Sequence, residues 1–96
     1  MRVDGRRGRR GFLTQKHLRD VLGRRTVQRI RDAGHNAGLR GPLAGRWEDA
    51  RRRGSVLVVT MDGIEVAEFI DFNRDGFVDE VFLARGHRNR RVVSRW

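Results

Sequence analysis

The side chains of this sequence that are best able to do chemistry are arginines, and they come in blocks. Residues 1–53 carry 16 Lys and Arg against 5 Asp and Glu, a net charge of +11, and residues 85–96 carry 5 Arg and no acid. Residues 54–84, between them, carry one Arg against 7 acids, a net charge of −6. Clustered guanidinium groups suit a polyanion, because each donates in a planar fork to phosphate and displaces its counterions. The blocks therefore predict a nucleic-acid partner.

The composition limits the other classes of protein. The excess of Arg over Lys could also reflect genome composition, so the prediction depends on the blocks and on the net charge of +10. A membrane surface is not expected, because the basic stretches lack the apolar face of an interfacial helix. With 96 residues and no Cys, we expect one small domain without disulfides or thiolate sites. The basic N-terminus leads into no apolar run, so we expect no secretory signal and a cytoplasmic location.

A second chemical pattern lies in the acidic block. Its spacing, D-x-N-x-D-G-x-x-D, is that of calcium loops, in which alternate residues turn oxygens toward one centre. The candidate ligands are Asp71, Asn73, Asp75, the Phe77 carbonyl and Asp79. An EF-hand needs Glu at the twelfth position, where this chain has Phe82. The flanks are strand-like, and the loop resembles those of FG-GAP-type β repeats, of which one copy is present.

Three interpretations of this acidic loop stay open. It could hold a structural calcium ion, and no other cofactor is expected. It could be a plain hairpin turn, since Asn-Arg-Asp-Gly favours a tight turn. The acids of the block could instead pair with the Arg blocks, within the fold or across a homodimer; these are Glu65, Glu68, Asp79 and Glu80.

The basic half of the chain is expected to be helical. Residues 1–11 are rich in Gly and Arg and predict a disordered basic arm. Within 13–53 the pattern predicts a helix capped by Thr14 and interrupted at Gly23, then a second one capped by Thr26 that ends near Gly34. Residues 35–42 form a loop. Residues 43–53 predict a third short helix, or a strand that starts at Trp47.

The acidic half is expected to be a β-meander over residues 55–84. Two β-rich runs joined by Asp62-Gly63 predict a type I′ hairpin, with Met61 opposite Ile64, Val59 opposite Val66 and Leu57 opposite Glu68. A third strand is expected over 77–84 and a short fourth through Val92 and Val93. The predicted class is α+β, with a basic N-terminal helical half packed on a three- to four-stranded antiparallel sheet. Residues 12–96 form the domain and end in a basic tail, 85–96.

Residues 13–34 resemble the helix-turn-helix of bacterial DNA-binding regulators. The matching residues are Thr14-Gln15, Leu18, Val21, Leu22-Gly23, Arg24-Arg25-Thr26-Val27 and Arg29-Ile30. The chain lacks the two residues that usually follow the Gly, which shortens the turn. The resemblance implies that one exposed face binds DNA, with Gln28 able to read adenine and an Arg able to read guanine. That face comprises Arg24, Arg25, Gln28, Arg29 and Arg31.

A second resemblance uses other residues. Residues 41–63 and 84–92 look like the RelE/ParE toxin superfamily, small basic proteins with a helical hairpin against a curved antiparallel sheet. Leu43, Gly45, Trp47, Arg53 and Gly86-His87-Arg88 stand in the places of that pattern. RelE-type members cleave messenger RNA on the ribosome. The resemblance implies that Arg53, Arg88 and Arg90 clamp the scissile phosphate and that His87 moves a proton.

These observations favour a DNA-binding regulator or an accessory factor. The alternatives are a ribosome-dependent ribonuclease of a toxin–antitoxin pair, and a protein-interaction module whose acidic sheet meets a basic partner. On the first interpretation the protein is not an enzyme.

Overall fold

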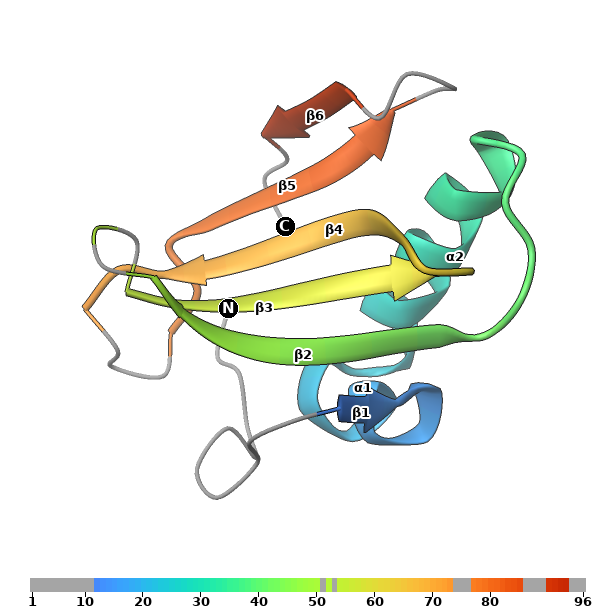
Figure 1. The fold of residues 1–96 in the computed structure, drawn as a ribbon. Coiled ribbons are helices and arrows are strands. Elements are labelled where there is room, and N and C mark those ends of the chain that lie inside the picture. Colours follow the sequence, from blue (N-terminus) through green and yellow to red (C-terminus); the bar gives the residue numbers. More distant parts are fainter. Residues whose placement is uncertain (1–11, 51, 53, 74–76, 86–89, 94–96) are drawn as a thin grey trace.

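The computed structural model describes residues 12–50, 52, 54–73, 77–85 and 90–93. Within these residues two helices lie on one face of a six-stranded antiparallel sheet (Figure 1). The strands follow one another across the sheet in chain order. The elements are β1 (Phe12–Thr14), α1 (Gln15–Leu22), α2 (Arg24–Asn36), β2 (Leu43–Ala50), β3 (Gly54–Met61), β4 (Ile64–Asp71), β5 (Glu80–Arg85) and β6 (Arg90–Val93). The predicted α+β class, with the helices before the main sheet, is confirmed.

Local chemistry sets the start of α1 and the break after it. Thr14 Oγ1 accepts from the backbone N–H of His17, and His17 Nδ1 accepts from that of Thr14, so the predicted N-cap is confirmed. Gly23 ends α1 at a φ of +89°, where its N–H donates to the Arg19 carbonyl at 2.8 Å. Only Gly adopts this conformation without steric cost, so a single residue separates the two helices.

The second helix begins earlier than predicted and ends close to the predicted place. It begins at Arg24, with Gly23 as the N-cap, so the expected cap at Thr26 is wrong. It ends at Asn36, and Gly34 lies buried within its last turns. Gly34 lies where α2 packs closely against β3: a Cβ at residue 34 would lie 2.7 Å from Met61 Sδ, so the Met61 side chain would have to move to admit one.

Residues 43–50 differ most from the sequence-based prediction of a third short helix over 43–53, which is wrong. Residues 43–50 form strand β2, which pairs with β3 at eight positions from Leu43↔Met61 to Ala50↔Gly54. A strand was the alternative, but it starts at Leu43 rather than Trp47. Leu43 and Gly45 are buried while Arg46 is exposed, the alternation of a strand with one covered face. With β1 as well, the sheet has six strands, so the prediction of three to four is also wrong.

The central hairpin has the predicted turn but a different register. Asp62 and Gly63 have φ values of +54° and +75°, as a type I′ turn requires, and Met61 pairs with Ile64. A bulge at Val59/Thr60 then shifts the pairing, so that Val59 faces Ala67 rather than Val66. For the same reason Leu57 faces Phe69 rather than Glu68. The bulge lets Val66 and Ala67 both join the core.

The remaining strands agree better with the sequence. The third predicted strand, over 77–84, is β5, which begins three residues later at Glu80. The predicted fourth strand through Val92 and Val93 is β6. None of the described helices is long and apolar enough to cross a membrane.

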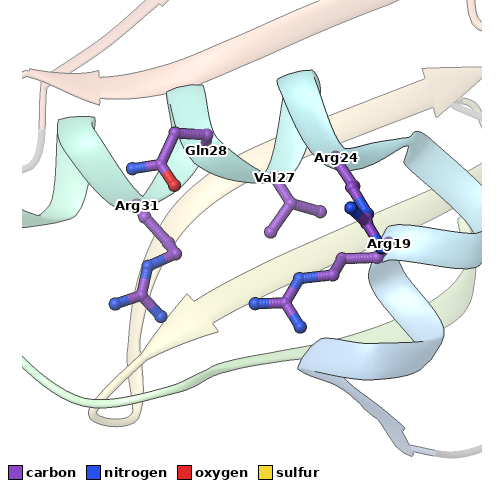
Figure 2. Close-up of a pocket in the computed structure, with 5 residues that line it drawn as sticks. All are labelled: Arg19, Arg24, Val27, Gln28 and Arg31. Carbon is purple, nitrogen blue, oxygen red and sulfur yellow. The ribbon is translucent and has the colours of Figure 1, made fainter.

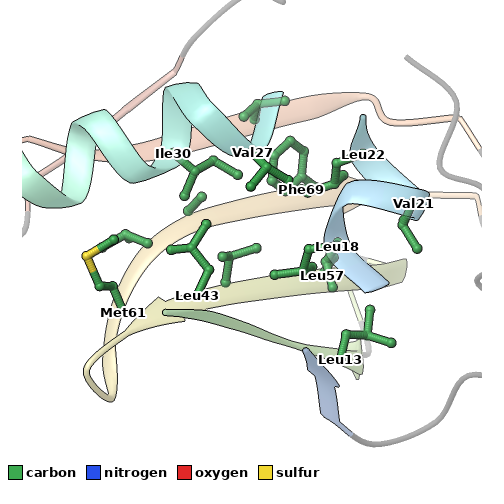
Figure 3. Packing of buried hydrophobic residues seen from close by; sticks show 14 residues of the cluster. Leu13, Leu18, Val21, Leu22, Val27, Ile30, Leu43, Leu57, Met61 and Phe69 are labelled. Carbon is green, nitrogen blue, oxygen red and sulfur yellow. The ribbon is translucent and has the colours of Figure 1, made fainter. Parts of the chain in front are cut away.

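The main core lies between the helices and the sheet (Figure 3). Its largest fully buried side chains come from both helices and from strands β2 to β4; they include Leu18, Ile30, Leu43, Leu57, Met61 and Phe69. A smaller apolar cluster lies on the opposite face of the sheet, formed by Val56, Val58 and Ile70. The helix pair is therefore held in place by a continuous apolar layer beneath it.

We expect Val59→Ala to lower the free energy of unfolding by about 1–3 kcal/mol, because Val59 is fully buried and its loss leaves a cavity. Urea denaturation followed by circular dichroism measures the loss. Ile64→Val, a truncation at a side chain that is 36% exposed, should cost about 0.5 kcal/mol or less. Equal losses in the two variants would contradict the placement of Val59 in the core.

Candidate nucleic-acid interface

The two helices form a recess with basic walls, with a volume of about 350 Å³. Arg19 from α1 and Arg24, Val27, Gln28 and Arg31 from α2 line it (Figure 2). Residues 24, 28 and 31 follow the i, i+4, i+7 spacing, which places them on one face of the helix. Val27 is 1% exposed and belongs to the core, so the recess sits directly over the apolar layer. We call this feature the arginine recess.

Arg31 is held by the side-chain amide oxygen of Gln15, which accepts two hydrogen bonds. Arg31 Nη1 donates to Gln15 Oε1 at 2.8 Å, and the backbone N–H of Leu43 donates to the same oxygen at 3.0 Å. Gln15 begins α1 and Leu43 begins β2, so a single amide oxygen joins both helices to the sheet. Gln15 and Arg31 are both half-buried. Arg31 is therefore fixed while most of its five donors remain available.

The arginine recess is strongly positive, because none of its lining residues is acidic. Among the described residues no acid forms an ion pair with Arg19 or Arg24. One of the lining side chains contacts an acid outside the recess: Gln28 Nε2 donates to Asp32 Oδ1 at 2.9 Å. Three guanidinium groups that share so small a volume repel one another, and an anion relieves that repulsion.

The predicted DNA-binding set is divided between two faces of α2. The structure brings Arg24, Gln28 and Arg31 together in the arginine recess. Arg25 and Arg29, four residues apart, are exposed and lie outside it. The sequence did not single out Arg19, which completes the recess from α1.

The sequence also did not single out Gln15, which holds Arg31. The available signal was the i, i+4 spacing of Gln15 and Arg19, which puts an amide and a cation on one face of α1.

The acidic loop is closed by protein hydrogen bonds. Asp79 Oδ2 accepts from the backbone N–H of Phe72 at 2.8 Å, and the N–H of Asp79 donates to the Ile70 carbonyl at 2.7 Å. Asp71 is buried at the end of β4, whereas Asn73 and Phe77 are exposed. Asp75 lies outside the described residues. Within the described part of the chain no three acidic or histidine side chains gather as metal ligands, and the calcium site stays a prediction.

The structure does not describe three of the four candidate nuclease residues. Arg53, His87 and Arg88 lie outside the described residues. Arg90 opens β6, where its backbone pairs with that of Arg85. Their proposed roles stay predictions.

Comparisons of this chain with protein-family models, with curated proteins and with solved structures found no match.

Proposed function

We propose that this protein binds nucleic acid, DNA in preference to RNA, through the outer side of the α1–α2 pair. The observation that carries the proposal is the arginine recess, in which cations from two helices meet without an acid among the lining residues. Such an arrangement favours phosphate, because each guanidinium neutralises one charge and releases its counterion. A regulator or an accessory factor of DNA transactions is the role that this activity fits.

The two basic faces of α2 suit two kinds of contact, one to the DNA backbone and one to base edges. The arginine recess grips the backbone, which fixes the position of the helix and carries no sequence information. Arg25 and Arg29 extend from the exposed side of a 13-residue helix, about 20 Å long, of a size that the major groove of B-DNA admits. Arg29 suits a guanine edge, and Gln28, at the boundary between the two faces, suits an adenine edge.

We expect affinity for duplex DNA to fall steeply with salt, with a slope of log K against log[salt] of roughly −5 for about 6 phosphate contacts. Replacing Arg19, Arg24 and Arg31 together by Ala should make the slope shallower by about 3 units, one for each lost contact. Fluorescence anisotropy at five salt concentrations measures both slopes.

Arg46→Ala is the matched control, because Arg46 lies on the sheet face away from the helices and pairs there with Glu48. Its slope should equal that of the unmodified protein. A flat salt dependence of the unmodified protein, or no binding at low salt, would refute the proposal.

A ribosome-dependent endoribonuclease is the second candidate. It is favoured by the order of the elements, in which a helix pair is followed by an antiparallel meander that it covers on one face. This is the architecture that the toxin resemblance implied. The catalytic set would be His87 with Arg53, Arg88 and Arg90.

Paired substitutions separate the two candidates. If the protein reads DNA, Gln28→Ala and Arg29→Ala should each reduce the preference for a selected target site by about 1–3 kcal/mol, whereas His87→Ala leaves it unchanged. If it is a nuclease, expression in a bacterial host arrests growth, and His87→Ala or Arg53→Ala relieves the arrest. If the protein neither binds duplex DNA nor arrests growth, the interaction module is the remaining hypothesis.

A further inference from the structure

We infer that the arginine recess is a preorganised site for a pair of linked phosphate groups, and that Gln15 is the positioning residue that prepares it. The inference rests on the proposed function, since it names what one part of the interface holds. The same chemistry would be offered by two neighbouring phosphates of a nucleic-acid backbone or by a free diphosphate.

The size and charge of the arginine recess point to more than one phosphate. Its volume, about 350 Å³, falls at the lower end of the roughly 300–1,000 Å³ of small-ligand pockets. Arg24 and Arg31 are seven residues apart on α2, so their Cα atoms are separated by about 10 Å along the helix axis. Arg19 approaches from the end of α1. Three cations spread over that length match an extended anion with two charged centres better than a single compact ion.

Gln15 prepares the site because it fixes a cation without cancelling its charge. A free arginine loses rotamer freedom when it binds, and that loss weakens binding. Here Arg31 is held before any ligand arrives, and Gln15 is itself anchored by the Leu43 N–H. A carboxylate at this position would hold Arg31 equally well but would neutralise it. The neutral amide is thus the side chain that provides orientation and preserves the positive potential.

The start of α2 adds to that potential beside Arg24. The N-cap is Gly23, which offers no side-chain acceptor to the N–H groups of the first turn. These groups carry the positive end of the helix dipole, which favours an anion nearby. The effect is secondary to the three guanidinium groups.

The test is calorimetric titration of the full chain with inorganic pyrophosphate at low salt. The unmodified protein should bind pyrophosphate more tightly than inorganic phosphate. Gln15→Glu should weaken pyrophosphate binding at least tenfold while the melting temperature stays the same or rises, because both hydrogen bonds to residue 15 are kept. Arg31→Lys should also weaken binding, because the planar fork is lost.

Lys16→Ala is the matched control, since it removes one positive charge from an exposed position of α1 next to Gln15, outside the recess. Its affinity for pyrophosphate should change less than twofold. Equal losses in Gln15→Glu and Lys16→Ala would show a diffuse charge effect and overturn the inference. No binding of pyrophosphate to the unmodified protein would overturn it as well, even where duplex DNA binds and the proposed function stands.

Competition identifies the source of the phosphates. Displacement of pyrophosphate by duplex DNA, with a parallel loss of DNA affinity in Gln15→Glu, would assign the recess to the nucleic-acid backbone. Simultaneous binding of both would assign it to a free diphosphate. Pyrophosphate binding without any duplex binding would support the recess and refute the proposed function.

Discussion

The close contact of α1 with strand β2 is the constraint on which the rest of the arrangement depends. A Cβ at residue 45 would lie 2.7 Å from Leu18 Cδ2, so the helix rests on the strand at a point where only Gly fits without a shift. Leu18 is fully buried there. This contact fixes the height of α1 above the sheet, and with it the reach of Gln15, one turn earlier, to the Leu43 N–H. A looser approach of α1 to β2 would separate the amide oxygen of Gln15 from the Leu43 N–H.

The single-residue link at Gly23 is the second constraint on the arginine recess. Because α2 begins at the residue after Gly23, the end of α1 and the start of α2 are necessarily adjacent, which brings Arg19 and Arg24 to one opening. The apolar side of α2, with Val27 and Ile30 buried, then sets the rotation of the helix about its axis. That rotation turns Arg31 toward Gln15 of α1, places Gln28 in the lining of the recess, and leaves Arg25 and Arg29 outside. The division of the basic residues into two groups thus follows from core packing.

Features whose chemistry is contained in a few neighbouring residues were predictable from the sequence. The Asp62-Gly63 turn, the Thr14 cap and the break at Gly23 are of this kind. Strand β2 and the bulge opposite Val59 were not, because pairing with β3 and burial beneath the helices decide them, and a local pattern does not contain that information.

The candidate site likewise has parts that the sequence predicts and parts that only the packing of the helices reveals. The sequence grouped Arg24, Gln28 and Arg31 with Arg25 and Arg29 as one DNA-binding set, and only the rotation of α2 on the core divides that set. The contributions of Arg19 and Gln15 require the packing of α1 beside α2 and against β2, which no spacing within one helix reveals. The acidic block lies apart from the arginine recess in the fold. Glu68 and Glu80 occupy register positions on the face of the sheet opposite the helices, beside Arg46 and Glu48, which pair with each other. If the proposed function holds, these two carboxylates would favour approach of a polyanion from the helix side, because like charges repel.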